Sequence, residues 1–193
     1  MLVAQAVIAS SHFTGRAYGA DVIDKVYREI VAEKENIVLV GMPGSGKSTV
    51  GALLCDRLQM PLIDTDACIV KRSGMAIPDI FATYGEAYFR RLESEVIAEV
   101  AQKSGCVIAT GGGAVLNPQN VHALRKNGRI FFLDRPLKDL LPTEDRPLAN
   151  SADAIRKRYE ERYEIYCASA DVPLQIVGDA RETAEELIRR RQI

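Results

Sequence analysis

The sequence predicts an α/β fold in which a central parallel β-sheet is flanked by helices. Short apolar runs rich in β-branched residues alternate with longer stretches of helical periodicity, a pattern typical of parallel sheets. A glycine-rich loop between the first apolar run and the next helical stretch is a second indication. At ~150 residues per domain, the 193 residues correspond to about 1.3 domains. One compact domain with an added segment is therefore expected.

The first strand is expected at residues 37–40, a continuous apolar run that ends at Gly41 and is typical of a strand buried on both faces. Similar runs complete the predicted sheet at residues 61–63, 106–109, 129–133 and 174–177. Apolar residues at helical spacing predict helices over residues 47–58, 85–103, 152–166 and 181–191. Residues 21–35 have the pattern of an amphipathic helix with no strand beside it. We therefore divide the chain into a helical extension, residues 1–35, and an α/β domain, residues 36–193.

Composition excludes several classes of protein. The 25 Lys and Arg residues are balanced by 26 Asp and Glu residues, so the chain lacks the basic excess that nucleic-acid binding favours. No apolar run approaches the ~20 residues that cross a bilayer, and the N-terminus lacks the basic start of a secretory signal. The four cysteines are scattered and form no metal-ligand spacing. We expect a soluble, cytoplasmic protein that binds neither nucleic acid nor membrane.

Residues 41–48, Gly-Met-Pro-Gly-Ser-Gly-Lys-Ser, match the phosphate-binding pattern G-x-x-x-x-G-K-[ST] between a predicted strand and a predicted helix. Glycines let backbone N–H groups approach phosphate oxygens, and the helix directs its positive end at the anion. Lys47 would reach the β- and γ-phosphates, and Ser48 would offer its hydroxyl to Mg²⁺. The alternative is a glycine-rich turn that merely begins a helix. The loop predicts that the protein binds a nucleotide, but it does not indicate which molecule accepts the nucleotide's phosphoryl group.

Two carboxylates, Asp64 and Asp66, follow the predicted strand at residues 61–63. At the carboxyl edge of a parallel sheet both can face the ligand crevice, where one could hold a metal-bound water and the other a substrate hydroxyl. The alternative is that one of them is the N-cap of a following helix.

The run at residues 106–113 ends in three glycines, where phosphate-loop proteins often carry a metal-binding Asp. The glycines permit close approach of a ligand to the backbone, or a tight turn. Arg90 and Arg162 lie on predicted helices with Glu residues three or four positions away. Ordinary ion pairs and a two-arginine clamp on a substrate carboxylate both fit this spacing.

From Asn36 onward the chain resembles the shikimate kinases. The motifs follow in that family's order: Gly-Met-Pro-Gly-Ser-Gly-Lys-Ser-Thr, Asp64-Thr-Asp66, the run from Ile80 to Glu93, Thr110-Gly-Gly-Gly-Ala, Arg146-Pro-Leu, and Arg162 with Tyr166. The resemblance implies a P-loop kinase fold with a mobile lid, and transfer of the γ-phosphoryl group of ATP to the 3-hydroxyl of shikimate. We expect a monomer whose small-molecule partners are ATP and shikimate, either alone or fused to a shikimate dehydrogenase.

The resemblance assigns roles to single residues. It makes Asp66, Lys47 and Arg146 catalytic, with Arg146 on the lid. Metal binding falls to Ser48 directly and to Asp64 through water, with Mg²⁺ as the cofactor. The implied ATP-binding residues are Gly44, Ser45, Gly46, Lys47, Ser48, Thr49 and Arg146. The implied shikimate-binding residues are Asp66, Arg90, Gly111, Gly112, Gly113 and Arg162, with the two arginines gripping the carboxylate.

Two features depart from the family pattern. The segment between Leu133 and Arg146 is shorter and more acidic than that family's lids and lacks a further arginine. The N-terminal stretch containing Gln5 resembles the closing helix of shikimate dehydrogenase, so residues 1–35 are expected to be a remnant of a dehydrogenase fused to the kinase, or else a plain N-terminal helix. The rival functions are another small-molecule kinase, such as a gluconate kinase, and a nucleotide-dependent regulatory module.

Overall fold

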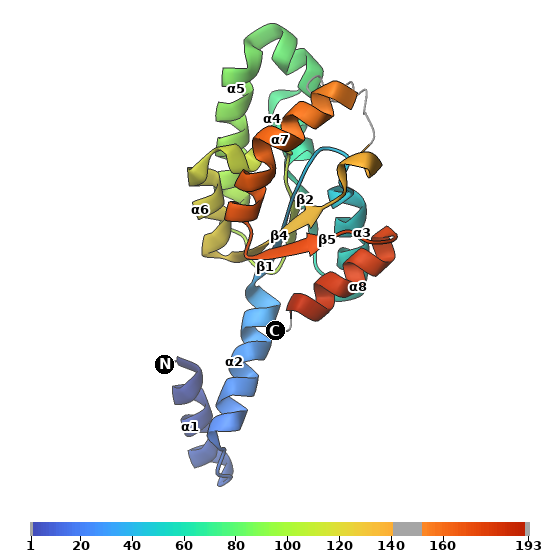
Figure 1. The fold of residues 1–193 in the computed structure, drawn as a ribbon. Coiled ribbons are helices and arrows are strands. Elements are labelled where there is room, and N and C mark those ends of the chain that lie inside the picture. The colour runs from blue at the N-terminus through green and yellow to red at the C-terminus, as the bar shows by residue number, and fades with distance from the viewer. Residues whose placement is uncertain (1, 141–151, 192–193) are drawn as a thin grey trace.

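The protein is built on a five-stranded parallel sheet with strand order β2-β3-β1-β4-β5 (Figure 1). The computed structural model describes residues 2–140 and 152–191. The strands are β1 (Asn36–Val40), β2 (Leu62–Asp64), β3 (Val107–Ala109), β4 (Gly128–Asp134) and β5 (Val172–Gln175). All five lie within a few residues of the predicted apolar runs, and the predicted parallel α/β architecture is confirmed.

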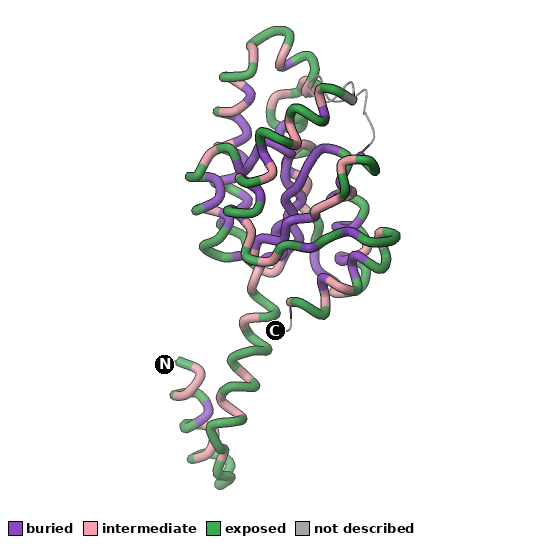
Figure 2. Tube along the Cα trace, in the orientation of Figure 1, coloured by how far each residue is buried: buried purple, intermediate pink, exposed green. Residues whose placement is uncertain are grey.

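Helices cover both faces of this sheet. They are α3 (Lys47–Leu58), α4 (Thr65–Ser73), α5 (Ile77–Val100), α6 (Pro118–Lys126), α7 (Ala152–Ser169) and α8 (Ala180–Arg191), with 3₁₀ turns η1 (Ala114–Leu116) and η2 (Leu137–Asp139). Side chains of β1 alternate between two cores. Ile37 and Leu39 pack toward α3 and α8, whereas Val38 and Val40 pack toward α5, α6 and α7. All four are fully buried, as expected for a central strand covered on both faces (Figure 2).

The strand register brings the candidate loops together. Ala109 at the end of β3 is opposite Leu39 of β1 on one side and Asp64 of β2 on the other. Because all strands are parallel, the loops that follow β1, β2 and β3 leave from the same edge of the sheet. This edge is where open α/β sheets bind ligands.

The structure contains helices that hydrophobic periodicity did not predict. Helices α4 and α6 have nine residues each, which is only two and a half turns and gives few repeats of an apolar position. Helix α5 begins at Ile77 rather than at Gly85, but it is broken at Gly85, whose φ of 77° and ψ of 174° are not helical. The periodic pattern therefore identified the second and longer part of α5.

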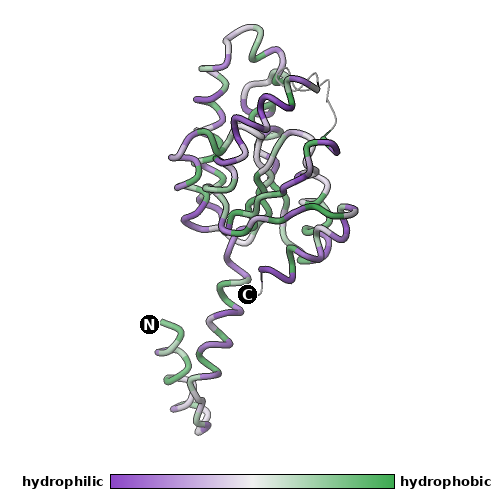
Figure 3. The backbone as a smooth tube through the Cα atoms, viewed as in Figure 1, coloured by the Kyte–Doolittle hydropathy of each residue, from purple (hydrophilic) through white to green (hydrophobic). Residues whose placement is uncertain are grey.

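The N-terminal extension is a helical hairpin that projects away from the sheet (Figure 1). Its helices are α1 (Leu2–Thr14) and α2 (Ala20–Lys34), and α2 leads into β1 through the single residue Glu35. Several of its apolar residues are exposed, among them Leu2, Ile8, Phe13, Tyr27 and Ile30. Figure 3 shows apolar and polar stretches along this hairpin. Within the described residues, Val7 is the buried residue of α1, and α2 has none.

The base of the hairpin is tied to the α/β domain by backbone contacts. The amide of Gly105 donates to the carbonyl of Lys34 at 2.8 Å. The guanidinium of Arg191, at the end of α8, donates to the carbonyl oxygens of Ala32 and Glu35. These bonds hold the C-terminal end of α2 against the domain. Helix α1 packs mainly against α2. Among residues 2–140 and 152–191, no helix combines the length and apolarity that a membrane crossing requires.

Candidate active site

The phosphate loop connects β1 to α3 and is shaped by glycines. Gly44 and Gly46 have φ angles of 81° and 93°, a left-handed conformation that residues with a Cβ rarely adopt. Lys47 is only 5% exposed. Its Nζ donates to the carbonyl oxygens of Gly41 and Met42, each at 2.9 Å. Gly44, Ser48 and Thr49 are exposed to solvent, whereas Ser45 is buried. The loop thus presents backbone and hydroxyl groups at the start of α3, where the helix dipole attracts an anion.

Asp64 has a structural task and also faces the phosphate loop. Its Oδ1 accepts hydrogen bonds from the amides of Asp66 and Ala67, so Asp64 is the N-cap of α4. Its Oδ2 accepts a hydrogen bond from the hydroxyl of Ser48 at 2.9 Å. The capping interpretation and the ligand-facing interpretation are therefore compatible, because each uses a different oxygen of one carboxylate.

The Ser48 and Asp64 pair also bears on metal binding. Hydroxyl and carboxylate oxygens are the ligands that Mg²⁺ prefers, usually together with water and substrate phosphates. This donor set suits a magnesium ion brought by a nucleotide rather than one held by the protein alone. Consistent with that, the described part of the chain has no cluster of three or more His, Cys, Asp or Glu residues able to hold a metal.

The glycines after β3 lie directly against the candidate substrate groups. A Cβ at Gly111 would be 2.6 Å from Asp66 Oδ1 and 2.9 Å from Glu93 Oε1, so both carboxylates reach the same point. A Cβ at Gly113 would be 2.1 Å from Arg90 Nη1. A side chain at either position would have to displace these groups. The absence of a side chain at Gly111 and Gly113 therefore allows the close approach of Asp66, Glu93 and Arg90, whereas a Cβ at Gly112 would meet Pro43 of the phosphate loop.

The turn that carries these glycines is fixed by hydroxyl groups. The amide of Gly111 donates to Thr65 Oγ1 at 3.0 Å, and the Thr110 hydroxyl donates to the carbonyl of Leu39 at 3.0 Å. Both threonines are buried. The strand end that lacks a metal-binding Asp is thus anchored to β1 and α4 instead.

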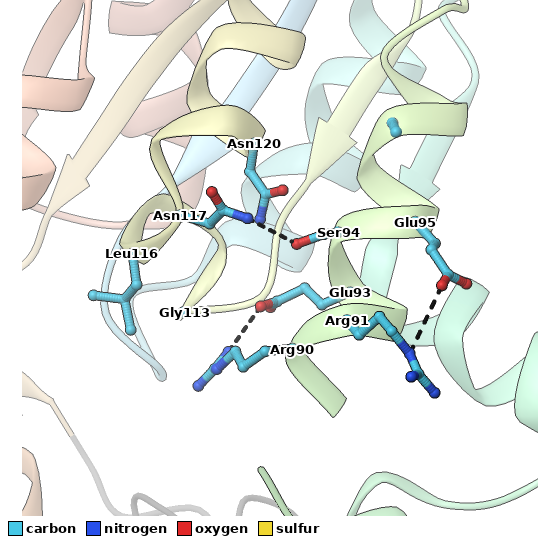
Figure 4. Close-up of a pocket in the computed structure, with 10 residues that line it drawn as sticks. Arg90, Arg91, Glu93, Ser94, Glu95, Gly113, Leu116, Asn117 and Asn120 are labelled. Atoms are coloured by element: carbon cyan, nitrogen blue, oxygen red, sulfur yellow. Dashed lines mark hydrogen bonds and ion pairs between the residues drawn. The ribbon is translucent and has the colours of Figure 1, made fainter. Parts of the chain in front are cut away.

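Arg90 projects from α5 beside Gly113 and pairs with two glutamates (Figure 4). Its Nη1 donates to Glu93 Oε2 at 2.8 Å, and its Nη2 donates to Glu86 Oε1 at 3.0 Å. Burial alone would lower the pKa of Arg90, but the two carboxylates outweigh burial and raise it. The neighbouring Arg91 turns to the other side of α5, toward Glu95. Arg90 is therefore a fixed cation at the pocket.

Glu93 is a site residue that the sequence interpretation did not assign. It is 1% exposed, and its Oε1 has no hydrogen-bond partner among the described residues. Burial raises the pKa of Glu93, and the opposing influence of Arg90 is the next largest. The sequence held a signal, because Glu93 follows Phe89 by four residues on the apolar stripe of α5. A charged residue on such a stripe requires a buried partner.

Arg162 of α7 contacts the same glycine turn. It is 8% exposed, and its Nη1 donates to the carbonyl of Gly112 at 3.1 Å. The hydroxyl of Tyr166, one turn later, donates to the same carbonyl oxygen. The ring of Tyr166 stacks on Phe132 of β4 with centroids 5.0 Å apart. Both Arg162 and Asp66 influence the pKa of Glu93, Arg162 lowering it and Asp66 raising it.

The structure thus gathers most of the expected site residues at one edge of the sheet. The loops after β1, β2 and β3 contribute the phosphate loop, Asp66 and the three glycines, while α5 and α7 contribute Arg90 and Arg162. Arg146 and the expected lid lie outside the described residues.

The chain is similar to known proteins of one family. The family model for shikimate kinase matches residues 43–192. A shikimate kinase of Caldanaerobacter subterraneus subsp. tengcongensis is 43% identical over 163 residues, covering 80% of this chain and 95% of that protein. A shikimate kinase of Caldicellulosiruptor bescii is 47% identical over 125 residues, covering 63% and 73%.

Solved structures of shikimate kinases are similar to this chain in fold. Shikimate kinase from Acinetobacter baumannii, solved in complex with shikimate, superposes with a TM-score of 0.79 at 30% identity, covering 84% of this chain and 96% of that chain. The Aquifex aeolicus shikimate kinase gives a TM-score of 0.69 at 37% identity, covering 80% and 94%. The P-loop kinase fold expected from the sequence is confirmed, and the chain belongs to the shikimate kinase family.

Proposed function

We propose that the chain transfers the γ-phosphoryl group of ATP to the 3-hydroxyl of shikimate, giving shikimate 3-phosphate and ADP. The observation that carries this proposal is the placement of two arginines, the partly buried Arg90 and the buried Arg162, beside Asp66 at the sheet edge that holds the phosphate loop. The arginines suit a substrate carboxylate, since guanidinium groups bind carboxylates with a geometric fit. Family membership supports the same activity.

In the proposed reaction each group has a positional role. The backbone of residues 44–49 and the Lys47 ammonium hold the phosphates of ATP, and the role proposed for Arg146 is to neutralise charge that develops on the transferred group. Ser48 directly, and Asp64 through water, would hold Mg²⁺, which would neutralise phosphate charge. Asp66 orients the attacking hydroxyl and accepts its proton. Arg90 and Arg162 bind the carboxylate and so fix the distance between hydroxyl and phosphate.

An ADP-release assay in the presence of Mg²⁺ tests this proposal against its rivals. Three reactions are compared: shikimate as acceptor, gluconate as acceptor, and no acceptor. We expect ADP release only with shikimate. Turnover with gluconate alone would establish a sugar-acid kinase, and acceptor-independent turnover would support the regulatory-module alternative.

Replacing Gly113 by Ala is expected to raise the KM for shikimate at least about tenfold, because the new methyl group displaces the Arg90 guanidinium. The φ of Gly113 is −104°, so alanine brings no backbone strain, and the displaced atom is the end of a flexible side chain. The melting temperature and the KM for ATP should therefore stay near wild type. Steady-state kinetics and thermal denaturation measure all three, and an unchanged KM for shikimate would contradict the role given to Arg90.

We further propose that residues 1–35 derive from the closing helices of a shikimate dehydrogenase and that the kinase acts as a cytoplasmic monomer. The exposed apolar side chains of α1, such as Ile8 and Phe13, support the first statement, because such a surface is usual in a helix that packs on another domain. A gene with no dehydrogenase sequence upstream in the same reading frame would disprove the derivation.

Deleting residues 1–19 is expected to leave kcat and both KM values unchanged. The deletion removes α1 and the turn after it, while the carbonyl groups of Ala32, Lys34 and Glu35 that anchor α2 remain. It also removes exposed Leu2, Ile8 and Phe13, so self-association at high concentration should fall. Steady-state assays and sedimentation velocity test the two statements, and a large loss of kcat would show that α1 acts on the kinase site.

A further inference from the structure

A third arginine lies near Arg90 and Arg162. Arg158 is on α7, one turn before Arg162, so the two side chains leave the same face of the helix. Its Nη1 is buried and has no hydrogen-bond acceptor among the described residues. A buried guanidinium N–H without an acceptor is unfavourable, because it has lost water and gained nothing in exchange.

Two carboxylates, Glu86 and Glu161, lie near Arg158, together with two cations. Burial lowers the pKa of Arg158, and the cations of Arg162 and Arg90 lower it further, whereas Glu86 and Glu161 act in the opposite direction. Both of these carboxylates already face other cations. Glu86 accepts from Arg90 at 3.0 Å, and Glu161 lies 3.9 Å from the ammonium of Lys157.

The buried carboxylate of the pocket is also engaged. Glu93 bonds Arg90 at 2.8 Å. Arg158 therefore lies near two other guanidinium groups, and the two carboxylates that act on it already pair with Arg90 and Lys157. Its buried Nη1 is a donor that an anion bound beside Arg162 could use.

We propose that Arg158 is a further substrate-binding residue, which donates from its buried Nη1 to the carboxylate of shikimate alongside Arg162. This inference rests on the proposed function, in which the carboxylate is the single charged group of the acceptor. It adds a specificity determinant to the two arginines that the family resemblance implies, and the i and i+4 spacing on α7 allows both side chains to reach one planar anion.

The test compares Arg158→Gln with Arg156→Gln, an exposed arginine two residues away on the same helix. We expect Arg158→Gln to raise the KM for shikimate by roughly tenfold, the usual effect of losing one charge-assisted hydrogen bond. The KM for ATP should not change, and Arg156→Gln should behave as wild type. Thermal denaturation of each variant establishes that it is folded.

A neutral substrate identifies the group that Arg158 contacts. The methyl ester of shikimate is assayed with wild type and with both variants. Arg158→Gln should weaken use of the acid much more than use of the ester, and Arg158→Lys should restore part of the loss with the acid. A merely structural role would weaken both substrates equally, and that result would overturn the inference, as would a wild-type KM in Arg158→Gln.

Failure of the inference can be separated from failure of the proposed function. If the unaltered protein does not phosphorylate shikimate, the proposed function itself is wrong and the inference falls with it. If the unaltered protein is active and the ratio of acid to ester turnover is the same in wild type, Arg158→Gln and Arg158→Lys, only the inference is wrong. Using the conservative lysine variant keeps the test decisive if the glutamine variant folds poorly.

Discussion

Asp66→Asn lowers turnover at saturating shikimate and ATP by about 10²- to 10⁴-fold, the range in which a general base contributes. The carboxylate of Asp66 lies at the point where Gly111 lacks a side chain, beside Glu93. Asparagine keeps the size of the side chain, and the backbone amide of residue 66 still donates to Asp64. The loss should therefore appear in kcat and leave the fold intact.

The matched control is Asp79→Asn, which neutralises an exposed carboxylate at the start of α5. Stopped-time assays of ADP release give kcat for both variants, and circular dichroism compares their folds. A kcat of Asp66→Asn close to wild type would show that Asp66 neither accepts the proton nor holds the attacking hydroxyl.

Lys47→Met lowers kcat/KM for ATP by about 10²- to 10³-fold, the usual loss when one donor to a developing anion is removed. Nζ of Lys47 donates to two loop carbonyl groups, which hold the ammonium at the phosphate loop. The same ammonium would donate to phosphate oxygens of a bound nucleotide. Methionine keeps the apolar stem of lysine and removes the charge and the donors.

The control for this variant is Lys71→Met on the exposed side of α4. Nucleotide titration measures affinity separately from turnover, so the contributions of Lys47 to binding and to chemistry can be divided. If Lys47→Met retained wild-type kcat/KM for ATP, the loop would be a nucleotide cradle whose lysine serves only to hold its own backbone.

Strong local patterns made most of the fold predictable. The β1 run is buried on both faces, so its sequence is apolar without interruption and its position was evident. Helix α4 was not predicted from periodicity because it is short, although its N-cap Asp64 was considered. The break in α5 at Gly85 is a backbone feature, and a single glycine in a sequence does not reveal whether its φ is positive.

Local sequence predicted those parts of the site that lie within one contiguous motif, but not which distant residues the fold brings together. The phosphate loop is contiguous, so its residues and their order define it. Arg90 and Arg162 lie 72 positions apart in the sequence, and nothing local shows that both face the turn at Gly112 and Gly113. Glu93 was missed because its role depends on burial, which the chain acquires only when α5 packs on the sheet.

The direct passage from α2 into β1 has a mechanical consequence. The five residues of β1 span ~17 Å and end at the phosphate loop. A pull on the hairpin along the strand would load the hydrogen bonds of β1 to both β3 and β4 in shear, all at once rather than one by one. A force on the hairpin is therefore transmitted to the central strand of the sheet through one residue, Glu35. If another domain were attached to the hairpin, a force from that domain would act first on the hydrogen bonds between β1 and its neighbours β3 and β4, and only then on the phosphate loop that contains Lys47.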